Sequence, residues 1–460
     1  MSHKIPEYDY IVLGAGSGGL LVAVGLEKLG KNYLVISENI GGDCTHYGCV
    51  PSKTLLHLAR EYSTHCSLKE KQQLKHNTLE NVRTMIHSFV EEENTLIPGD
   101  KYVKGTARFI SGNTVEVIGN KLKHQYRFRK KCIIATGSSP KRTTISGLSS
   151  DKIITNEEFF YLENLPKSVT ILGAGPIGAE LATACAHFRI PTYLVSRSYL
   201  PSEPEQVSKR SLEALQKLGV QYIAAKPVKV DNDQLFLDNG STIPHTDYYI
   251  SAIGRKPNTE LNLEAAQVLY DEKGIDVSEN LETSNRVIYA IGDCTNNPQF
   301  THLAAHHGKY VLKKIAVPFA RQKKRAIPRV TFTDPPVASV EYVKESKDTH
   351  AFEILFSNSD RGRIQSDKKG YGLVYVNLNT GAIVGVSMIG AFVEELISLF
   401  TLIIDEKIPL LHLTGFITPY PTYANIIHRL TVDYLGYLTR NGKQRPLSSI
   451  HQLFSYLFFS

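Results

Sequence analysis

Two cysteines inside a glycine-rich run carry the most distinctive chemistry of this sequence. Cys44 and Cys49 stand five positions apart in the run G-G-D-C-T-H-Y-G-C-V-P-S-K. On an ideal helix this spacing gives about 7.5 Å of rise, more than the roughly 4.4–6.8 Å between the Cα atoms of a disulfide. A bond between them therefore needs a distorted first turn, which Gly48 would allow. Pro51 suits the first turn of a helix, and thiols at that positive helix end should have a lowered pKa, as a redox pair requires.

Other roles for the cysteines are weaker. A zinc site needs further ligand pairs at short spacing, and the sequence has none. Two isolated buried cysteines would not need the flanking glycines. Six cysteines in 460 residues are too few for a disulfide framework. The other four are expected to be buried small apolar residues, namely Cys66, Cys132, Cys185 and Cys294.

The elements that must position the pair begin with a dinucleotide fingerprint. A strand, a helix and a second strand are predicted over 10–13, 20–29 and 33–36. Between the first strand and the helix stand Gly14, Gly16 and Gly19. They permit the tight turn, the approach of a pyrophosphate and the packing of helix on strand, respectively. The helix N-terminus then faces the phosphates.

A second fingerprint repeats the pattern. Gly173, Gly175 and Gly178 stand between a predicted strand over 169–172 and a predicted helix over 179–188. One G-x-G-x-x-G is weak evidence, and the alternative is two glycine-rich turns in unrelated α/β units. Two copies in the right context predict two bound dinucleotides, with electron transfer from one to the other.

Composition and charge exclude several classes of protein. The chain has 460 residues, of which 42% are hydrophobic and 21% charged, so it is a globular chain long enough for two to four domains. Its 52 Lys+Arg and 45 Asp+Glu leave a net charge of +7, too evenly spread to predict nucleic-acid binding. We find no targeting segment, and Glu394 and Glu395 interrupt the longest apolar region. We therefore expect a cytoplasmic protein with no integral membrane segment.

The run around Cys44 and Cys49 closely resembles the redox-active segment of the FAD-dependent pyridine nucleotide–disulfide oxidoreductases. This family includes glutathione reductase, dihydrolipoamide dehydrogenase and mercuric reductase. The runs at 135–137, 289–293 and 328–335 resemble the flavin-facing strand end, the second FAD motif and the start of the dimerisation domain. The run P-Q-F-T-H at 298–302 and the Gly-Gly-Asp before Cys44 are most similar to the mercuric-reductase-like branch.

The resemblance covers essentially the whole chain and implies its fold. We expect an α/β protein with two doubly wound, Rossmann-like domains, which bind FAD and NAD(P), and a C-terminal α+β dimerisation domain. The implied segments are 1–150 and 258–326 for FAD, 151–257 for NAD(P) and 327–460 for dimerisation. The protein is expected to be a homodimer whose partner subunit completes each active site.

The resemblance also implies an electron path and the residues along it. NADPH would reduce FAD, and FAD would reduce the Cys44–Cys49 disulfide. Cys49 would be the charge-transfer thiolate beside the flavin, and Cys44 the outer thiol that attacks the substrate. Lys53 and Glu180 match the family's ion pair beside the flavin, although Lys53 could also be a solvated helix lysine. Besides the fingerprint glycines, the implied cofactor contacts are Gly42, Thr136, Gly137, Gly254 and Asp293, the last on the ribityl chain.

Two residues bear on the nucleotide ribose groups. An NAD site usually has an acid at the end of its second strand, which binds the ribose 2′-hydroxyl. In the second unit this position carries no acid, and Arg197 is able to pair a 2′-phosphate. We therefore predict NADPH rather than NADH, the alternative being an arginine on the surface with no ligand. In the first unit Ser37 stands at the usual position, and Glu38 is the candidate for the adenosine ribose of FAD.

The sequence departs from the family near its end. Disulfide-reducing members carry a His-Pro-Thr run with a Glu five residues after the His, a dyad that serves the interchange thiol. Here Tyr420 and Asn425 stand at those positions. Tyrosine, with a pKa of about 10 against about 6.5 for histidine, is a poor base at neutral pH. His428 is nearby, but on a helix it would point elsewhere. Tyr420 would act across the dimer.

Three hypotheses for function follow. In the first, the dithiol reduces a small disulfide, a thiophilic metal ion or another soft acceptor; mercury itself is unsupported because the chain's end carries no cysteine pair. In the second, the flavin reduces quinone or oxygen directly, and that activity would survive replacement of Cys44 and Cys49 by serine. In the third, the protein is a redox sensor that binds a partner through its apolar C-terminal tail, whose other predicted role is docking on its own dimer. No resident metal is predicted.

Overall fold

The computed structural model describes residues 5–64, 67–119, 122–341, 343–367 and 369–440, so Cys66 and the C-terminal tail lie outside the described residues. Two compact units are present: unit 1 is Met1–Gly173 with Pro227–Lys323, and unit 2 is Ala174–Lys226 with Lys324–Ser460. The predicted 151–257 segment is thus divided between them. Within unit 1, β9 (Val169–Ala174) pairs in parallel with β15 (Tyr248–Ser251), which keeps these two strands together.

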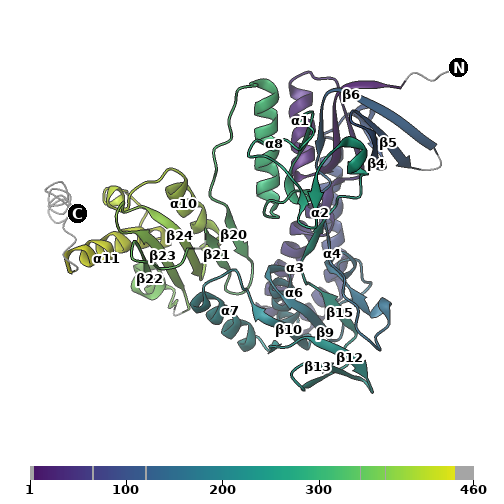
Figure 1. The fold of residues 1–460 in the computed structure, drawn as a ribbon. Helices are drawn as coiled ribbons and strands as arrows, with labels where there is room; N and C mark the ends of the chain where they lie inside the picture. Colours follow the sequence, from purple (N-terminus) through teal and green to yellow (C-terminus); the bar gives the residue numbers. More distant parts are fainter. Residues whose placement is uncertain (1–4, 65–66, 120–121, 342, 368, 441–460) are drawn as a thin grey trace. The chain divides into compact units, whose positions relative to one another are not determined.

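The main sheet of unit 1 has the order β3-β2-β1-β6-β5-β4, with β19 also paired to β6 (Figure 1). Strands β2, β1, β6 and β19 run parallel, and β4, β5 and β6 form an antiparallel meander. Ile11 and Val12 of β1 are fully buried, as expected of a central parallel strand covered on both faces. The bounds are Glu7–Gly16 (β1), Tyr33–Gly41 (β2), Tyr102–Lys104 (β3), Thr106–Ser111 (β4), Thr114–Gly119 (β5), Leu122–Ile134 (β6) and Ile288–Ala290 (β19).

Helices α1 (Ser17–Lys28) and α8 (Thr301–Ala316) lie side by side next to this sheet (Figure 1). They approach closely because the crossing residues are small: a Cβ on Gly18 would lie 2.9 Å from the carbonyl oxygen of Ala304. Two helices follow the cysteine run, α3 (Cys49–Thr64) and α4 (Leu68–Asn94), and they pack together. A short helix, α2 (Gly42–His46), follows β2 directly. These elements bring the cysteine run to the end of the first βαβ unit.

Smaller elements complete unit 1. Strands β8 (Ile153–Ile154) and β9 flank β15 in parallel. The remaining elements are β7 (Ser138–Pro140) with β16 (Arg255–Pro257), β12 (Pro227–Asp231), β13 (Gln234–Leu237) and β14 (Thr242–Pro244), β17 (Tyr270–Asp271) with β18 (Gly274–Ile275), and α5 (Asn156–Phe159).

Unit 2 contains the helix of the second fingerprint and an antiparallel sheet. Helix α6 (Pro176–His187), strands β10 (Thr192–Tyr199) and β11 (Gln221–Ile223), and α7 (Glu205–Lys217) come from its first segment. Its second segment forms the sheet β20-β21-β24-β23-β22, on which α10 (Val393–Asp405) and α11 (Ile426–Arg440) pack. The strand bounds are Pro328–Thr331, Val337–Val340, Ile383–Ile389, Tyr371–Asn377 and Thr349–Leu355 in that order; α9 is Asp360–Ile364.

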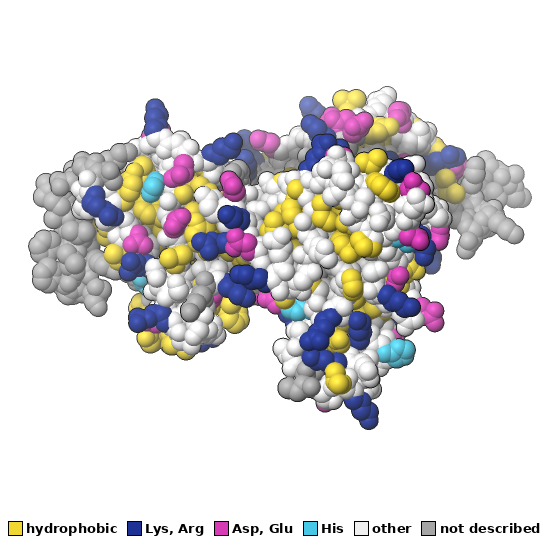
Figure 2. Space-filling view, turned by 90° about the horizontal axis from the view of Figure 1, so that it is seen from below, with side chains coloured by type: hydrophobic (Ala, Val, Ile, Leu, Met, Phe, Trp, Pro, Cys, Tyr) yellow, Lys and Arg dark blue, Asp and Glu magenta, His cyan; other side chains and the backbone are white. Residues whose placement is uncertain are grey.

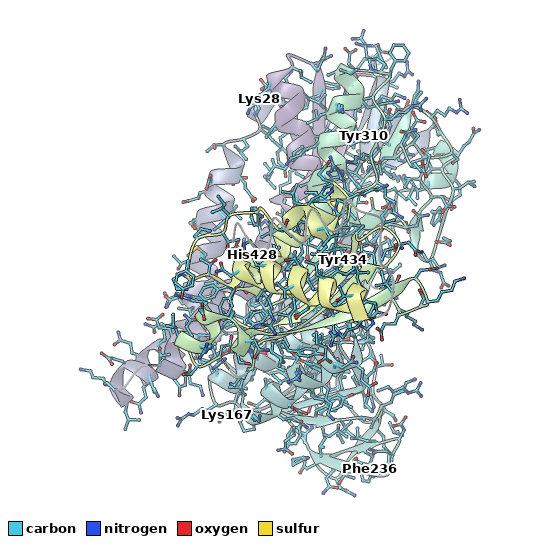
Figure 3. All side chains as sticks on the ribbon, turned by 90° about the vertical axis from the view of Figure 1, so that its left-hand side faces the viewer. Lys28, Lys167, Phe236, Tyr310, His428 and Tyr434 are labelled. Carbon is cyan, nitrogen blue, oxygen red and sulfur yellow. The ribbon has the colours of Figure 1, made fainter. Side chains whose placement is uncertain are left out.

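The core of this second sheet is built from aromatic and branched side chains of both layers. Phe400 of α10 and Tyr434 of α11 are fully buried in it with Val374 of β23. Figure 3 shows Tyr434 and His428 along α11. The predicted α/β fold class with a C-terminal α+β region is confirmed.

On one face of the molecule, charged side chains of both signs are mixed (Figure 2). In Figure 2, Lys and Arg side chains are interspersed with Asp and Glu side chains over the face in view. Among the described residues, none of the helices combines the length and the apolar character that a bilayer crossing requires.

Candidate active site

The two cysteines lie at a break between two helices. Cys44 belongs to α2, which ends at His46, and Cys49 is the first residue of α3. The Tyr47 amide donates to the carbonyl of Asp43 at 2.8 Å, which closes the end of α2. A Cβ at Gly48 would lie 3.0 Å from Asp43 Oδ2, so the small residue accommodates the turn. The predicted distortion of the helix between the cysteines is therefore confirmed.

Both cysteines are thiols in the structure, with Cys44 half-buried and Cys49 exposed. The pKa of the Cys44 thiol is raised, first because it shares a hydrogen bond with Cys49 and then because it is buried. The expectation of a lowered thiol pKa is thus wrong for Cys44, which lies in α2 and not at the N-terminus of α3. Cys132, Cys185 and Cys294 are buried, as predicted.

Thr301 is a contact that the sequence analysis missed. As the first residue of α8, it places Oγ1 at 3.7 Å from Cys49 Sγ. The same hydroxyl hydrogen-bonds Cys44 and lowers the pKa of that thiol, against the larger effects that raise it. Thr301 stands 252 positions from Cys49, and no spacing rule connects the two residues.

Side chains from α4 and α5 fix the turn between the cysteines. Thr45 Oγ1 donates to Glu93 Oε1 at 2.9 Å, and Asn156 Nδ2 donates to the carbonyl of Tyr47 at 2.8 Å. His46 Nε2 lies 2.8 Å from a backbone carbonyl oxygen of β2. Burial raises the pKa of Glu93. These bonds hold the redox segment by its centre rather than by its ends.

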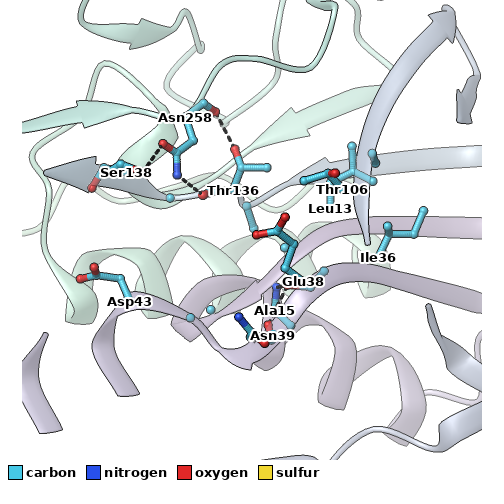
Figure 4. A pocket seen from close by; sticks show the side chains of 18 of the residues that line it. Leu13, Ala15, Ile36, Glu38, Asn39, Asp43, Thr106, Thr136, Ser138 and Asn258 are labelled. Atoms are coloured by element: carbon cyan, nitrogen blue, oxygen red, sulfur yellow. Dashed lines mark hydrogen bonds between the residues drawn. The ribbon is translucent and has the colours of Figure 1, made fainter. Parts of the chain in front are cut away.

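A cavity of about 510 Å³ opens beside this segment (Figure 4). Asp43 and Ser138 lie toward one end of it, and Ile36 and Thr106 toward the other. Six of the predicted FAD contacts line it: Gly14, Gly16, Glu38, Gly42, Thr136 and Gly137. The side chain of Thr136 is held in place by a hydrogen bond, since its hydroxyl donates to the carbonyl of Asn258 at 2.8 Å.

Glycines keep the cavity open where a phosphate must approach the backbone. At Gly14, which has a φ of 99°, a Cβ would lie 2.3 Å from the carbonyl oxygen of Ala135. At Gly42, which has a φ of 62°, it would lie 2.6 Å from the Cα of Gly16. Gly19 acts behind the cavity, where a Cβ would meet the Gly14 carbonyl at 2.0 Å, so it serves helix–strand packing as predicted. The cradle and its size fit FAD.

The two polar residues after β2's core take different roles. Ser37 Oγ accepts from the Ala15 amide at 3.1 Å and donates to the Asn39 carbonyl at 2.7 Å, so it closes the turn. Glu38 is exposed on the cavity wall, where its carboxylate is available to a ribose hydroxyl. This geometry favours the predicted role of Glu38.

Asp293 of the second FAD motif is linked to the cavity through Ser138. Asp293 does not line the cavity, but its Oδ2 accepts from Ser138 Oγ at 2.9 Å, and Ser138 does line it. Burial raises the pKa of Asp293, partly offset by the Ser138 hydrogen bond and by Arg255. Gly254, which has a φ of 107°, precedes Arg255 and is also outside the cavity wall.

The predicted flavin-side ion pair falls on two elements of different units. Lys53 lies on α3 one turn after Cys49, so the two side chains share a helix face. Glu180 is buried on α6, where its Oε1 accepts from the Phe332 amide at 3.0 Å. Their pairing stays a prediction.

The second fingerprint has the expected local geometry. Gly173 has a φ of 105°, and a Cβ there would lie 2.4 Å from a carbonyl oxygen; Gly175 is the N-cap of α6, and Gly178 is buried within that helix. Arg197 is exposed near the end of β10, free to meet a phosphate from solvent.

Tyr420 and Asn425 lie before α11 in unit 2. Tyr420 is 71% exposed, and a hydrogen bond to Asp360 raises the pKa of its phenol. Asn425 Oδ1 accepts from the hydroxyls of Thr418 at 2.6 Å and Thr422 at 3.3 Å, so its amide oxygen closes the local turn. His428 lies on α11 (Figure 3). Neither Tyr420 nor Asn425 is arranged as a base.

No group of three or more His, Cys, Asp or Glu side chains in the described part of the chain is arranged to hold a metal ion.

Family models match most of the chain. Residues 8–308 match the family model "Pyridine nucleotide-disulphide oxidoreductase", and residues 327–431 match the dimerisation domain of that family. A dihydrolipoyl dehydrogenase of Geobacillus stearothermophilus is 30% identical over 94% of this chain and 97% of its own. A mercuric reductase of Bacillus cereus is 28% identical over 91% of this chain and 70% of its own.

Solved structures show the same fold. The Cu(II) complex of RclA, an HOCl-induced flavoprotein disulfide reductase from Escherichia coli, has a TM-score of 0.84 and 23% identity. The match covers 93% of this chain and 99% of that one. Members of the matched family use FAD and a pyridine nucleotide. The chain therefore belongs to the pyridine nucleotide–disulfide oxidoreductases, enzymes with a dimerisation domain that this chain also carries.

Proposed function

We propose that this enzyme passes electrons from NADPH through FAD to the Cys44–Cys49 disulfide, and from the dithiol to a small soft acceptor. The observation that carries the proposal is the dithiol itself: two thiols in hydrogen-bond contact, beside a glycine-lined cavity that fits FAD. Bound FAD supplies two-electron chemistry between a pyridine nucleotide and the disulfide.

The protein's own residues divide the work. The cavity glycines and Glu38 hold FAD, and Arg197 pairs the 2′-phosphate of NADPH. Cys49 holds the thiolate charge, and the Thr301 hydroxyl, 3.7 Å away, donates a hydrogen bond to it. Cys44 is the outer thiol that contacts the acceptor, and Lys53 and Glu180 form the ion pair beside the flavin.

With a disulfide acceptor, the Cys44 thiolate attacks one sulfur, the acceptor's S–S bond breaks, and one acceptor thiolate leaves. The Cys49 thiolate then attacks Cys44 Sγ, which reforms the Cys44–Cys49 disulfide and releases the second acceptor thiolate. Two electrons have passed to the acceptor, and two protons convert its thiolates to thiols. With a metal ion, the dithiol closes to the disulfide while two one-electron ions, such as Cu(II), are each reduced once.

The protonation of Cys44 favours the metal among these acceptors. Attack on a disulfide needs a thiolate, yet the pKa of Cys44 is raised and Tyr420 is no base for it. A thiophilic metal ion displaces the thiol proton as it binds, so it needs no such base. The similar RclA structure is a Cu(II) complex. We therefore propose that thiophilic metal ions such as Cu(II) are better acceptors for this enzyme than small disulfides.

We also propose a homodimer in which Tyr420 of the partner subunit faces Cys44. The dimerisation-domain match supports the assembly. In this position the phenol, whose pKa is raised, acts as a proton donor to a leaving thiolate and not as a base.

A second function is favoured by one observation. Because neither Tyr420 nor Asn425 supplies a base, electrons would leave directly from the flavin to quinone or oxygen if Cys44 turned over too slowly. The cysteine pair would then be regulatory.

Anaerobic titration of the purified protein with NADPH, and in parallel with NADH, tests both proposals. A long-wavelength thiolate-to-flavin absorption band under NADPH, lost in Cys49→Ser, supports the dithiol path. Bleaching of the flavin without that band supports quinone or oxygen reduction. Cys44→Ser then separates the acceptors: Cu(II) and small-disulfide reduction should be lost, whereas benzoquinone reduction should survive. A protein that purifies without flavin and fails to bind it refutes the proposal.

A further inference from the structure

The charged side chains that line the FAD cavity are acidic, although the pyrophosphate of FAD is itself an anion. Among the described residues that line it are four carboxylates and no lysine or arginine: Glu38, Asp43, Glu157 and Glu260. Glu38 has a predicted ribose role, but Asp43 lies next to Gly42 and Cys44, at the end where the phosphate cradle meets the redox segment (Figure 4). A dianionic group brought beside an uncompensated carboxylate would be repelled.

The carboxylate of Asp43 is paired with one guanidinium, that of Arg255. Arg255, with a side chain only 12% exposed, donates from Nη2 to Asp43 Oδ1 at 2.8 Å. The same nitrogen donates to the Ser138 carbonyl at 2.7 Å, and Nε donates to Ser138 Oγ at 2.8 Å. A buried, multidentate arginine of this kind is far more specific than a surface ion pair.

The hydrogen bonds run in one direction from Arg255 to the second FAD motif. Since Ser138 Oγ accepts from Arg255, its own proton is directed to Asp293 Oδ2, at 2.9 Å. Asp293 is therefore the acceptor of this bond, which is stronger when its side chain is a carboxylate. Two carboxylates, Asp43 on the redox segment and Asp293 on the ribityl side, depend on one cation.

Their charges are coupled through that cation. Burial is the main cause that raises the pKa of Asp293; Asp43 raises it further, and Ser138 and Arg255 lower it. Glu157 faces the same groups: burial and Asp43 raise the pKa of its carboxyl, while Arg255 and Arg142 lower it. Without Arg255, the hydrogen bond from Ser138 would be the remaining effect that lowers the pKa of Asp293. Burial and the charge of Asp43 would still raise it.

We infer that Arg255 is the positioning residue that keeps Asp293 ionised for FAD and, through Asp43, ties the flavin site to the start of the redox segment. This inference rests on FAD occupying the cavity. It goes beyond the proposed function, because it names the group that balances the acidic cavity and links the flavin site to the dithiol.

The test compares FAD affinity near pH 6 and pH 8 in apo-protein of the wild type, Arg255→Met, Asp43→Asn and the double variant. Free flavin is measured by fluorescence after ultrafiltration. Lys229→Met is the matched control, since Lys229 is exposed and pairs with Asp231, and neither residue lines the cavity. We expect Arg255→Met to weaken FAD binding about tenfold or more near pH 8, as for a lost charged hydrogen bond. The loss should be larger near pH 6 than near pH 8, because the lower pH favours protonation of Asp293 once Arg255 no longer lowers its pKa.

Asp43→Asn gives the diagnostic outcome. In the Arg255→Met background it removes the repulsion on Asp293, so it should recover part of the lost FAD affinity near pH 6. If Arg255→Met does not fold by circular dichroism, Ser138→Ala removes the relay and keeps the Arg255–Asp43 pair. It should show the same steeper pH dependence.

Three results would overturn the inference: FAD affinity of Arg255→Met within about twofold of the wild type at both pH values, an equal loss at both, or no recovery with Asp43→Asn. When Ser138→Ala stands in, a pH dependence like that of the wild type overturns it. Wild-type protein that binds no FAD would instead refute the proposed function.

Discussion

Replacing Thr301 by valine should weaken the thiolate state of the dithiol without changing the shape of the site. Valine is close to threonine in volume but lacks the hydroxyl that lies 3.7 Å from Cys49 Sγ and also bonds Cys44. A hydrogen bond to a charged group contributes roughly 1.5–3 kcal/mol. Because 3.7 Å is long for this contact, we take the lower end, about 1.5 kcal/mol, which corresponds to about one pH unit in a titration midpoint.

The assay is the ultraviolet absorbance of the thiolate in the reduced apo-protein, followed from about pH 5 to pH 10. The two thiols titrate as a pair, so the lower apparent midpoint of the pair is the measured quantity. We expect it to rise by about one pH unit in Thr301→Val and to stay near the wild-type value in Thr301→Ser, which keeps the hydroxyl. A midpoint in Thr301→Val that coincides with the wild type would show that the hydroxyl does not stabilise the thiolate.

Three further outcomes are expected. Arg197→Ala should lower kcat/KM for NADPH about tenfold or more, the effect of one lost charged hydrogen bond, and leave NADH nearly unchanged; equal losses would refute the 2′-phosphate contact. Tyr420→His combined with Asn425→Glu should raise small-disulfide turnover near pH 7 at least about tenfold. General acid–base assistance typically increases a reaction rate by about 10²–10⁴-fold. Urea unfolding should show stability that is full above about pH 6.5 and falls toward pH 4, by about 3 kcal/mol, because burial lowers the pKa of His307 to about 4 and the unfolded chain takes up the proton first. In His307→Gln that loss should be smaller.

Local motifs could be predicted from the sequence because each is completed within a few residues. The two glycine fingerprints, the cysteine run and the alternation of strands and helices all depend on neighbours along the chain. Thr301 and Arg255 could not be found this way, since they reach the redox segment from 252 and 212 positions away. The raised pKa of Cys44 was missed for the same reason, because burial and the partner thiol determine it.

The residues that depart from the family pattern change where protons are available, and this constrains the acceptor. Tyr420 is a phenol with a raised pKa, and Asn425 uses its amide oxygen to accept from two threonines. Near the thiols, the described groups that move the pKa of Cys44 are Cys49, which shares a hydrogen bond with it, and Thr301, whose hydroxyl is not a base at neutral pH. A neutral disulfide reacts only with the thiolate form of Cys44, so it depends on ionisation of the free thiol. An electrophile that binds sulfur strongly promotes this ionisation as it binds. Under the proposed function, we therefore expect an acceptor that supplies its own driving force for deprotonation rather than one that relies on the enzyme for it.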